Sequence, residues 1–223
     1  MLDVVQGFVD MIEDEELRES VKELLHDPPC ELDAPSLLLE VCPAGAYQHH
    51  SYSGGLLEHT ICVVKISLTL CDLLEDYYGC EVDRDVVLAG AILHDIMKCY
   101  CYERSDDHSF RTSDLGGRID HLTLMVGELM KRGFPLDVVH VVAGHHGDVG
   151  GTKPRTPEAL VVSLADLVDS DLNGKLLRAA EYLLRRVGVS RPVVGSGADA
   201  VEVVDVKNRE GWEGLKRLVE GKG

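Results

Sequence analysis

An almost wholly apolar segment, VVLAGAILHDIMKCY, runs from Val86 to Tyr100 and is interrupted by His94 and Asp95. A helix that is apolar on all sides belongs at the centre of a helical bundle, and Asp85 can cap its start. A histidine and an aspartate in such a core cost several kcal/mol unless other groups satisfy them. The fold must therefore bring partners to this pair from elsewhere in the chain.

Apolar residues recur at helical spacing along most of the remaining chain. The N-terminal section should be helical from Val5 to the proline pair at 28–29, and the polar stretch 103–117 should be a loop. Thr156 and Pro157 provide the N-cap and the first position of a later helix. Helices are predicted over residues 5–27, 56–74, 86–100, about 119–131, from 137 onward, over 156–171, and then in a further helix that continues to 186.

The pattern changes beyond Gly188. The segment VEVVDV at 201–206 alternates apolar and polar residues as a strand does, and a short helix containing Trp212 follows it. We therefore expect an all-α fold. A helical bundle of residues 1–187, with its motifs between 47 and 175, would carry a small C-terminal appendage, residues 188–223, that could hold a short strand and a helix.

Charge and hydropathy restrict the partners of this chain. The formal net charge is -17, with 39 acids against 22 lysines and arginines, whereas a protein that grips a long polyanion normally shows a basic stripe. Nucleic acid is therefore a disfavoured partner. The first residues, MLDVVQGFVDMIEDEEL, carry acids where a secretory signal carries bases, and no stretch approaches the roughly 20 apolar residues that span a bilayer. These patterns predict a cytoplasmic protein without membrane association.

Histidine and aspartate recur in short motifs: GGLLEHT, LHDIMK, IDHLT, GHHG and SLADLVD. Separately satisfied core histidines are one interpretation, but a shared metal centre would satisfy all of these side chains together. Imidazole and carboxylate ligands without sulfur suit Mn, Fe, Co, Ni or Zn in a catalytic site. The two oxygens of Asp95 could bridge two ions about 3.5 to 4 Å apart, the spacing of two-metal hydrolytic sites. The predicted metal ligands are His59, His94, Asp95, His121, His145, His146 and Asp166.

The order H…HD…H…HH…D resembles that of the HD superfamily of metal-dependent phosphohydrolases. Over residues 47–175, the motifs HHSYSGGLLEHT, AGAILHDIMK, GHHG and PRTPEAL are similar to the HD domain of bacterial 3′-to-5′ exoribonucleases. The resemblance implies an HD-type helical bundle with two divalent ions, because relatives with one metal lack the second histidine group. His59, His94, Asp95 and Asp166 would hold one ion, and Asp95, His121, His145 and His146 would hold the other.

The same resemblance implies roles for further side chains. Lys98 matches a lysine that contacts substrate phosphate, although Met97 replaces the glycine usual before it. Asp169 matches a second family aspartate and could orient a ligand histidine, or it could be an ordinary acid on a helix face. We thus expect catalytic roles for Asp95, Lys98 and Asp169, and substrate contacts from Lys98, His49, His50, Arg111 and Arg118, with Lys153 and Arg155 as further loop bases that could meet phosphate.

The expected reaction is hydrolysis of a small phosphate ester. The exoribonucleases carry an OB-fold domain that grips the strand, and the residues before the first motif leave no room for one. Overall similarity to archaeal iron-dependent phosphodiesterases acting on dihydroneopterin 2′,3′-cyclic phosphate favours a cyclic ester as substrate. It also favours Fe²⁺, with Mn²⁺, Ni²⁺, Co²⁺ and Zn²⁺ as alternatives.

Two other functions stay open: an exoribonuclease or nucleotide phosphohydrolase, and a non-catalytic nucleotide-binding sensor. The intact ligand set argues against the sensor, because a pure binding module has no need of seven ligands. Apolar faces on the first helix and on the tail could serve a homo-oligomer, although helices docked within one monomer would explain them equally well.

Overall fold

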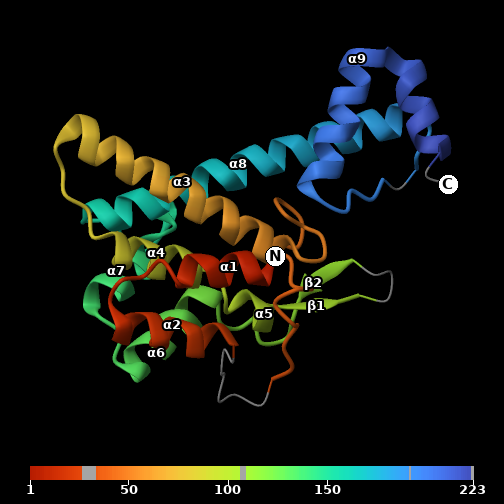
Figure 1. Ribbon diagram of the computed structural model, residues 1–223. Helices are drawn as coiled ribbons and strands as arrows, with labels where there is room; N and C mark the ends of the chain where they lie inside the picture. Colours follow the sequence, from red (N-terminus) through yellow and green to blue (C-terminus); the bar gives the residue numbers. More distant parts are fainter. Residues whose placement is uncertain (27–33, 106–108, 191, 222–223) are drawn as a thin grey trace.

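Helices make up nearly all of the regular structure in the computed structural model, which describes residues 1–26, 34–105, 109–190 and 192–221 (Figure 1). This is the all-α fold that the sequence predicts. The elements of the described residues are, in chain order, α1 (Leu2–Val9), α2 (Glu15–His26), α3 (Gly55–Tyr78), α4 (Arg84–Leu93), α5 (Lys98–Cys101), β1 (Tyr102–Arg104), β2 (Phe110–Thr112), α6 (His121–Arg132), α7 (Leu136–Gly144), the 3₁₀ turn η1 (Gly147–Val149), α8 (Pro157–Arg186) and α9 (Gly197–Gly221).

Helix α4 lies at the centre of the bundle. It contacts α3, α7 and α8, and α1 and α2 pack on it as well. Every residue from Val86 to Leu93 is buried, which confirms the prediction from the apolar segment. The cap is Asp83 rather than Asp85, because the Asp83 carboxylate accepts from the N–H groups of Asp85 and Val86. The Asp85 carboxylate instead accepts from the backbone of Glu13 and Asp14 and so ties α2 to α4.

The predicted helix over 86–100 is interrupted between Leu93 and Lys98. From residue 96 to residue 100, backbone N–H groups donate mainly to the carbonyl three residues earlier. Such a tight turn has about 3.0 residues per turn, so side chains three apart lie one above the other. Lys98 therefore stands directly over Asp95. His94 and Asp95 therefore lie in the turn after α4, and both side chains are buried.

Two other boundaries differ from the prediction. The N-terminal section forms two helices, α1 and α2, instead of one, and the stretch predicted as a loop at 103–117 contains the antiparallel hairpin β1–β2. A cross-strand ion pair, Glu103 with Arg111 at 2.7 Å, and the buried ring of Phe110 hold the hairpin together. Strands of three residues are too short to give a readable alternation, so the sequence pattern indicated only polarity.

Helix α8 is a single helix of 30 residues, where the sequence suggested two. Thr156 is its N-cap as predicted, and its hydroxyl accepts from the N–H of Ala159. The helix runs from the bundle to the C-terminal tail, where α9 packs against its second half (Figure 1). Among the described residues, no helix combines the length and the apolar character that a membrane span requires.

The strand predicted at 201–206 is wrong, because this segment lies inside α9. The hydroxyl of Ser196 accepts from the N–H of Asp199 and caps the helix start. Ala200 and Val203, three residues apart, are buried against α8 in a second hydrophobic cluster with Leu177. Tertiary packing thus overrides a local alternation that strands and helices can share. The domain boundary at residue 187 stays a prediction.

Candidate metal centre

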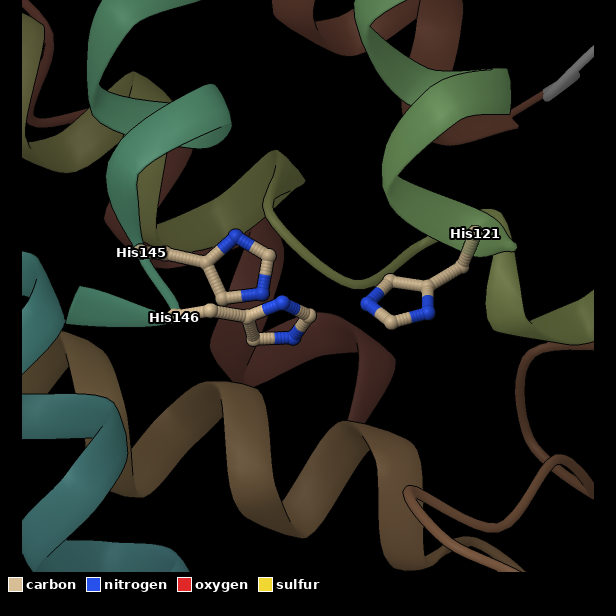
Figure 2. A group of neighbouring side chains, drawn as sticks. All are labelled: His121, His145 and His146. Atoms are coloured by element: carbon tan, nitrogen blue, oxygen red, sulfur yellow. The ribbon is translucent and has the colours of Figure 1, made fainter. Parts of the chain in front are cut away.

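The structure brings all seven predicted ligands to one place. They come from five parts of the bundle: α3, the turn after α4, the start of α6, the end of α7 and the middle of α8. The rings of His145 and His146, at the end of α7, point toward the ring of His121 at the start of α6 (Figure 2). The donor atoms form two clusters, which we call site A (His59, His94 and Asp166) and site B (His121, His145 and His146).

Asp95 lies between the two sites. Its Oδ2 is 3.4 Å from Nε2 of His59 and 3.4 Å from Nε2 of His94, both in site A. Its Oδ1 is 3.1 Å from Nε2 of His121 and 3.7 Å from Nε2 of His145, both in site B. One carboxylate therefore presents one oxygen to each cluster, which is the arrangement a ligand shared by two ions requires.

Two of the predicted ligand histidines, His94 and His145, are held by their other ring nitrogens. Nδ1 of His94 donates to the carbonyl of Ala91 at 2.8 Å, and Nδ1 of His145 donates to the carbonyl of Val142 at 2.7 Å. Each of these rings follows its carbonyl by three residues at the end of a core helix. Fixing Nδ1–H in this way leaves the Nε2 lone pair free for a cation and sets the direction in which it points.

Two buried atoms in this cluster lack a hydrogen-bond partner: Oδ1 of Asp95 and Nε2 of His121. They lie 3.1 Å apart without the alignment of a hydrogen bond. Two ligands of one ion, each about 2.1 Å from it, stand about 3.0 to 3.4 Å apart. The separations in site A and the distance between Asp95 and His121 lie in this range, whereas Asp95 and His145 are slightly farther apart at 3.7 Å. The nitrogen–oxygen donor set fits divalent transition metals.

The pKa values agree with metal ligation in site B. Burial lowers the pKa of His145 to about 3 and also lowers the pKa of His146, so both rings are neutral and able to bind a cation. In site A, burial alone would lower the pKa of His59. The hydrogen bonds that its ring donates to Asp166 and Asp169 outweigh burial and raise the pKa well above its ordinary value. A proton on His59 therefore occupies the place that a cation would take between the ring and the carboxylates.

Lys98 is buried with its Nζ 2.5 Å from Oδ2 of Asp95. Burial alone would raise the pKa of Asp95, but the positive charge of Lys98, together with the interactions with the neighbouring imidazole rings, outweighs it and holds the pKa well below its usual range. Burial disfavours the charged ammonium as well, yet Asp95 more than offsets this and raises the pKa of Lys98. The two groups are thus an ionised pair at the junction of the two sites.

A cavity of about 590 Å³ opens beside the ligands. Lys98, His145, His146 and Asp166 line its polar part, and Arg178 lines it farther along α8. The remaining wall is mixed: Val149, Pro154, Leu160, Leu164 and Leu167 are apolar, and Gln48, His49, Asp148, Ser163, Ser170 and Asp171 are polar. A cleft of this size with apolar walls and convergent polar groups is typical of a small-molecule site.

Comparison with known proteins shows which family this helical bundle belongs to. The family model of the HD domain matches residues 56–171, more than half of the chain, and this range holds all seven predicted ligands. The chain belongs to the HD domain family. HD domains bind divalent metals, and sites A and B are two of the three clusters among the described residues that could hold one; the third, His50, His59 and Asp169, shares His59 with site A.

The relatives of this HD domain include a phosphodiesterase and several exoribonucleases by name. A dihydroneopterin 2′,3′-cyclic phosphate phosphodiesterase of Methanocaldococcus jannaschii is 44% identical over 206 residues, which are 91% of this chain and 82% of that protein. The 3′-5′ exoribonuclease YhaM of Bacillus subtilis is 29% identical over 142 residues, which are 59% of this chain but only 43% of that enzyme. YhaM of Listeria innocua is 30% identical over the same length. No solved structure matches the chain.

The residues predicted to contact substrate divide into two groups in this HD domain. His49 and Lys98 line the cavity, and burial lowers the pKa of His49 to about 4, so its ring is neutral. Arg111 and Arg118 pair with acids, Glu103 and Asp114 respectively. Neither arginine is among the described residues that line the cavity, and neither are Lys153 and Arg155.

His50 also lies away from the cavity, because it is buried and both of its ring nitrogens have protein partners. Met97, which replaces the usual glycine, packs in the hydrophobic core and does not narrow the cavity. Asn173 and Arg178, which follow the predicted ligand Asp166 on α8, were not predicted from the sequence. The signal for Asn173 was its spacing, since Asp166, Asp169 and Asn173 are polar at helical intervals in a largely apolar helix.

We expect a chelator to lower the midpoint of thermal unfolding of the metal-loaded protein by about 5 to 10 °C. An ion present at 100 times its dissociation constant stabilises the folded state by about 2.7 kcal/mol, and 1 kcal/mol shifts the midpoint by about 2 to 4 °C at this chain length. Removing the ions also leaves Oδ1 of Asp95 and Nε2 of His121 buried without partners. Calorimetry before and after chelation measures the shift. Restoring Mn²⁺ or Fe²⁺ should reverse it, whereas an unchanged midpoint would contradict a metal at either site.

Proposed function

We propose that this HD domain is a two-metal phosphodiesterase that hydrolyses a small cyclic phosphate ester, with 7,8-dihydroneopterin 2′,3′-cyclic phosphate as its substrate. The observation that carries the proposal is the position of Asp95, whose two oxygens face separate histidine clusters beside a cavity. The 44% identity to the Methanocaldococcus jannaschii enzyme over most of both chains supports the choice of substrate. We propose Fe²⁺ as the metal, with Mn²⁺, Ni²⁺, Co²⁺ and Zn²⁺ as alternatives.

In the proposed reaction, water attacks phosphorus, one ester bond of the ring breaks, and the released ring oxygen takes up a proton to give a phosphomonoester. When bound, two divalent cations supply Lewis-acid stabilisation of the charge that grows on the phosphoryl oxygens. Asp95 would hold both cations at a fixed separation. The ammonium of Lys98, at the cavity wall, would add positive charge for the phosphate, and its ion pair with Asp95 keeps it in place.

The cavity favours a small substrate with an apolar, flat part. Its volume lies within the roughly 300 to 1,000 Å³ that small-molecule sites occupy. Leu160, Leu164 and Leu167 give one wall on which a heterocycle can lie while the phosphate meets the polar part. The net charge of -17 opposes a long polyanion. We propose a small-molecule phosphate ester as the partner, in the cytoplasm; self-association stays a prediction.

Incubating the metal-loaded protein anaerobically with the cyclic pterin phosphate should produce the phosphomonoester, which chromatography with phosphorus NMR detects. Parallel reactions with the five candidate metals identify the ion that gives the highest turnover. Absence of monoester with every metal would remove the pterin substrate. Turnover of bis-p-nitrophenyl phosphate under the same conditions separates a phosphodiesterase of different specificity from a non-catalytic sensor, which would leave both compounds intact.

An exoribonuclease is the second candidate, because the YhaM enzymes align with this HD domain at 29–30% identity. A labelled single strand added to the same reactions tests it. Progressive shortening from the 3′ end, with binding that weakens steeply as salt is raised, would favour this candidate over the cyclic ester. We expect no shortening, because the cavity has few basic residues to follow a phosphate backbone.

A further inference from the structure

A chain of hydrogen bonds extends outward from site A. Nδ1 of His59 lies 2.6 Å from Oδ2 of Asp169, and the same oxygen lies 2.8 Å from Nε2 of His50. Nδ1 of His50 is in turn 2.8 Å from the hydroxyl of Tyr52. All four side chains are buried, and we call this series the relay. It connects a proposed metal ligand to a tyrosine that touches neither the cavity nor either site.

The chemistry of the groups fixes which of them donates. An ionised carboxylate only accepts, so Asp169 accepts from Nδ1–H of His59 and from Nε2–H of His50. The remaining nitrogen of His50 forms the hydrogen bond with the Tyr52 hydroxyl. With Nδ1 of His59 carrying the hydrogen, its Nε2 lone pair is directed at site A. Asp169 thus fixes which ring nitrogen of His59 faces site A, and His50 and Tyr52 hold Asp169 in place.

His50 is held in an unusual backbone conformation to take part. Its φ is +42°, the only positive φ among the non-glycine residues that the structure describes. Its N–H donates to Oδ1 of Asn173 at 2.6 Å, and its carbonyl accepts from the N–H of Ala44 at 3.2 Å. Asn173 also donates through Nδ2 to the Tyr52 hydroxyl at 3.1 Å. A residue that several hydrogen bonds hold in a strained backbone conformation is typical of a functional position.

The outer end of the relay lies in the packing of the tail. The ring of Tyr52 belongs to the second hydrophobic cluster, together with Leu177 of α8 and Ala200 and Leu215 of α9. Gly197, the first residue of α9, approaches the same place closely. A Cβ added there would lie 2.5 Å from Oε1 of Glu58 and 3.5 Å from the Tyr52 hydroxyl. The docked tail therefore holds Tyr52 on one side while the relay holds it on the other.

We propose that Tyr52 and His50 are positioning residues through which the docked tail keeps His59 oriented for site A. The inference rests on the proposed role of His59 as a metal ligand, and it assigns to α9 a part in metal binding. Loss of a partner outside the ligand shell typically lowers metal affinity about 10- to 100-fold. Because the relay reaches His59 and none of the histidines of site B, the loss of metal affinity should affect only one of the two ions.

The variant Tyr52→Phe tests the proposal, because it removes the hydroxyl and leaves the ring in the tail cluster. Titration calorimetry of the full chain with Mn²⁺ should show the affinity for one ion lowered about 10-fold and the other unchanged. Absorption spectra of the Co²⁺-loaded protein should change in the same variant. Tyr182→Phe is the matched control: Tyr182 lies on α8 near the tail, more than half exposed, and its hydroxyl is outside the relay.

A second variant, Gly197→Ala, perturbs the relay from the side of the tail, because its Cβ would displace the Glu58 carboxylate, which hydrogen-bonds the Tyr52 hydroxyl. We expect it to lower the same single affinity, by less than Tyr52→Phe does. An unchanged affinity in Gly197→Ala alongside a weakened one in Tyr52→Phe would overturn the part assigned to α9. Two ions bound with wild-type affinities in Tyr52→Phe would overturn the relay while leaving the proposed function intact.

Two further outcomes are decisive. If Tyr52→Phe weakens both ions equally and lowers the unfolding midpoint of the metal-free protein, the tyrosine is structural only and the proposal is overturned. If the wild-type protein itself binds fewer than two ions, the two-metal centre fails, and the inference fails with it. The wild-type titration therefore distinguishes failure of the proposed function from failure of the relay.

Discussion

The variant Asp95→Asn is expected to lose at least about 10³-fold in phosphodiesterase turnover, because the two proposed ions would lose the only ligand they share. Asparagine keeps the shape of the side chain but offers one acceptor oxygen. Its NH₂ group would face one of the two histidine clusters, 3.1 to 3.7 Å from their Nε2 atoms, where a cation should bind. Metal analysis should therefore show fewer than two ions per chain alongside the loss of turnover.

The same substitution leaves the buried ammonium of Lys98 without its partner, which costs about 3 to 5 kcal/mol of stability. The double variant Asp95→Asn with Lys98→Met separates the two effects, because it removes the unpaired charge. We expect the double variant to recover thermal stability without recovering activity. Asp205→Asn, which loses an exposed ion pair with Arg209, is the matched control and should behave as wild type. Normal turnover in Asp95→Asn would contradict a shared carboxylate.

The variant Gly90→Ala is expected to lower stability by about 1 to 3 kcal/mol. A Cβ at this position would lie 2.2 Å from Cγ1 of Val141, so α4 and α7 would have to move apart. His94 and His145 follow these two residues by four positions each, and their ring centroids are 5.0 Å apart. A displacement of about 1 Å at reacting groups can cost about 10²-fold in rate, and we expect a loss of this order.

Thermal unfolding and turnover of Gly90→Ala measure both effects. Adding Val141→Ala removes the methyl groups that the new Cβ would meet, so the double variant should recover part of each loss. Gly127→Ala is the control, because a Cβ there meets nothing within 4 Å and alanine favours a helix over glycine. Wild-type stability and turnover in Gly90→Ala would show that the two helices do not set the spacing of the ligands.

The central part of this fold could be predicted from the sequence because its signals are strong and local. The apolar segment around His94 and Asp95 has only one stable place, inside a bundle, and buried polar residues in it require partners. Motifs of histidine and aspartate then identify those partners without knowledge of the fold. The seven side chains indeed lie together, although they come from five parts of the chain.

The parts that could not be predicted depend on contacts between distant segments. Nothing near VEVVDV distinguishes a strand from a helix, and packing of Val203 on α8 decides the matter. The sequence motif predicts that His49 and His50 both contact the substrate. The ring of His50 lies in the interior instead, because it contacts Asp169, which is 119 residues away. The end of α4 at Leu93 likewise depends on how the turn after it fits between neighbouring helices.

Helix α8 joins the two hydrophobic clusters without a break. Over about 45 Å, at 1.5 Å per residue, one rod carries Asp166 and Asp169 near its middle and the anchor points of the tail beyond them. A C-terminal segment usually tolerates truncation, fusion and sequence drift, but here such changes would be transmitted along one continuous helix to the two carboxylates proposed for the metal centre. Substitutions in the last thirty or so residues should thus be limited by the requirements of the metal centre.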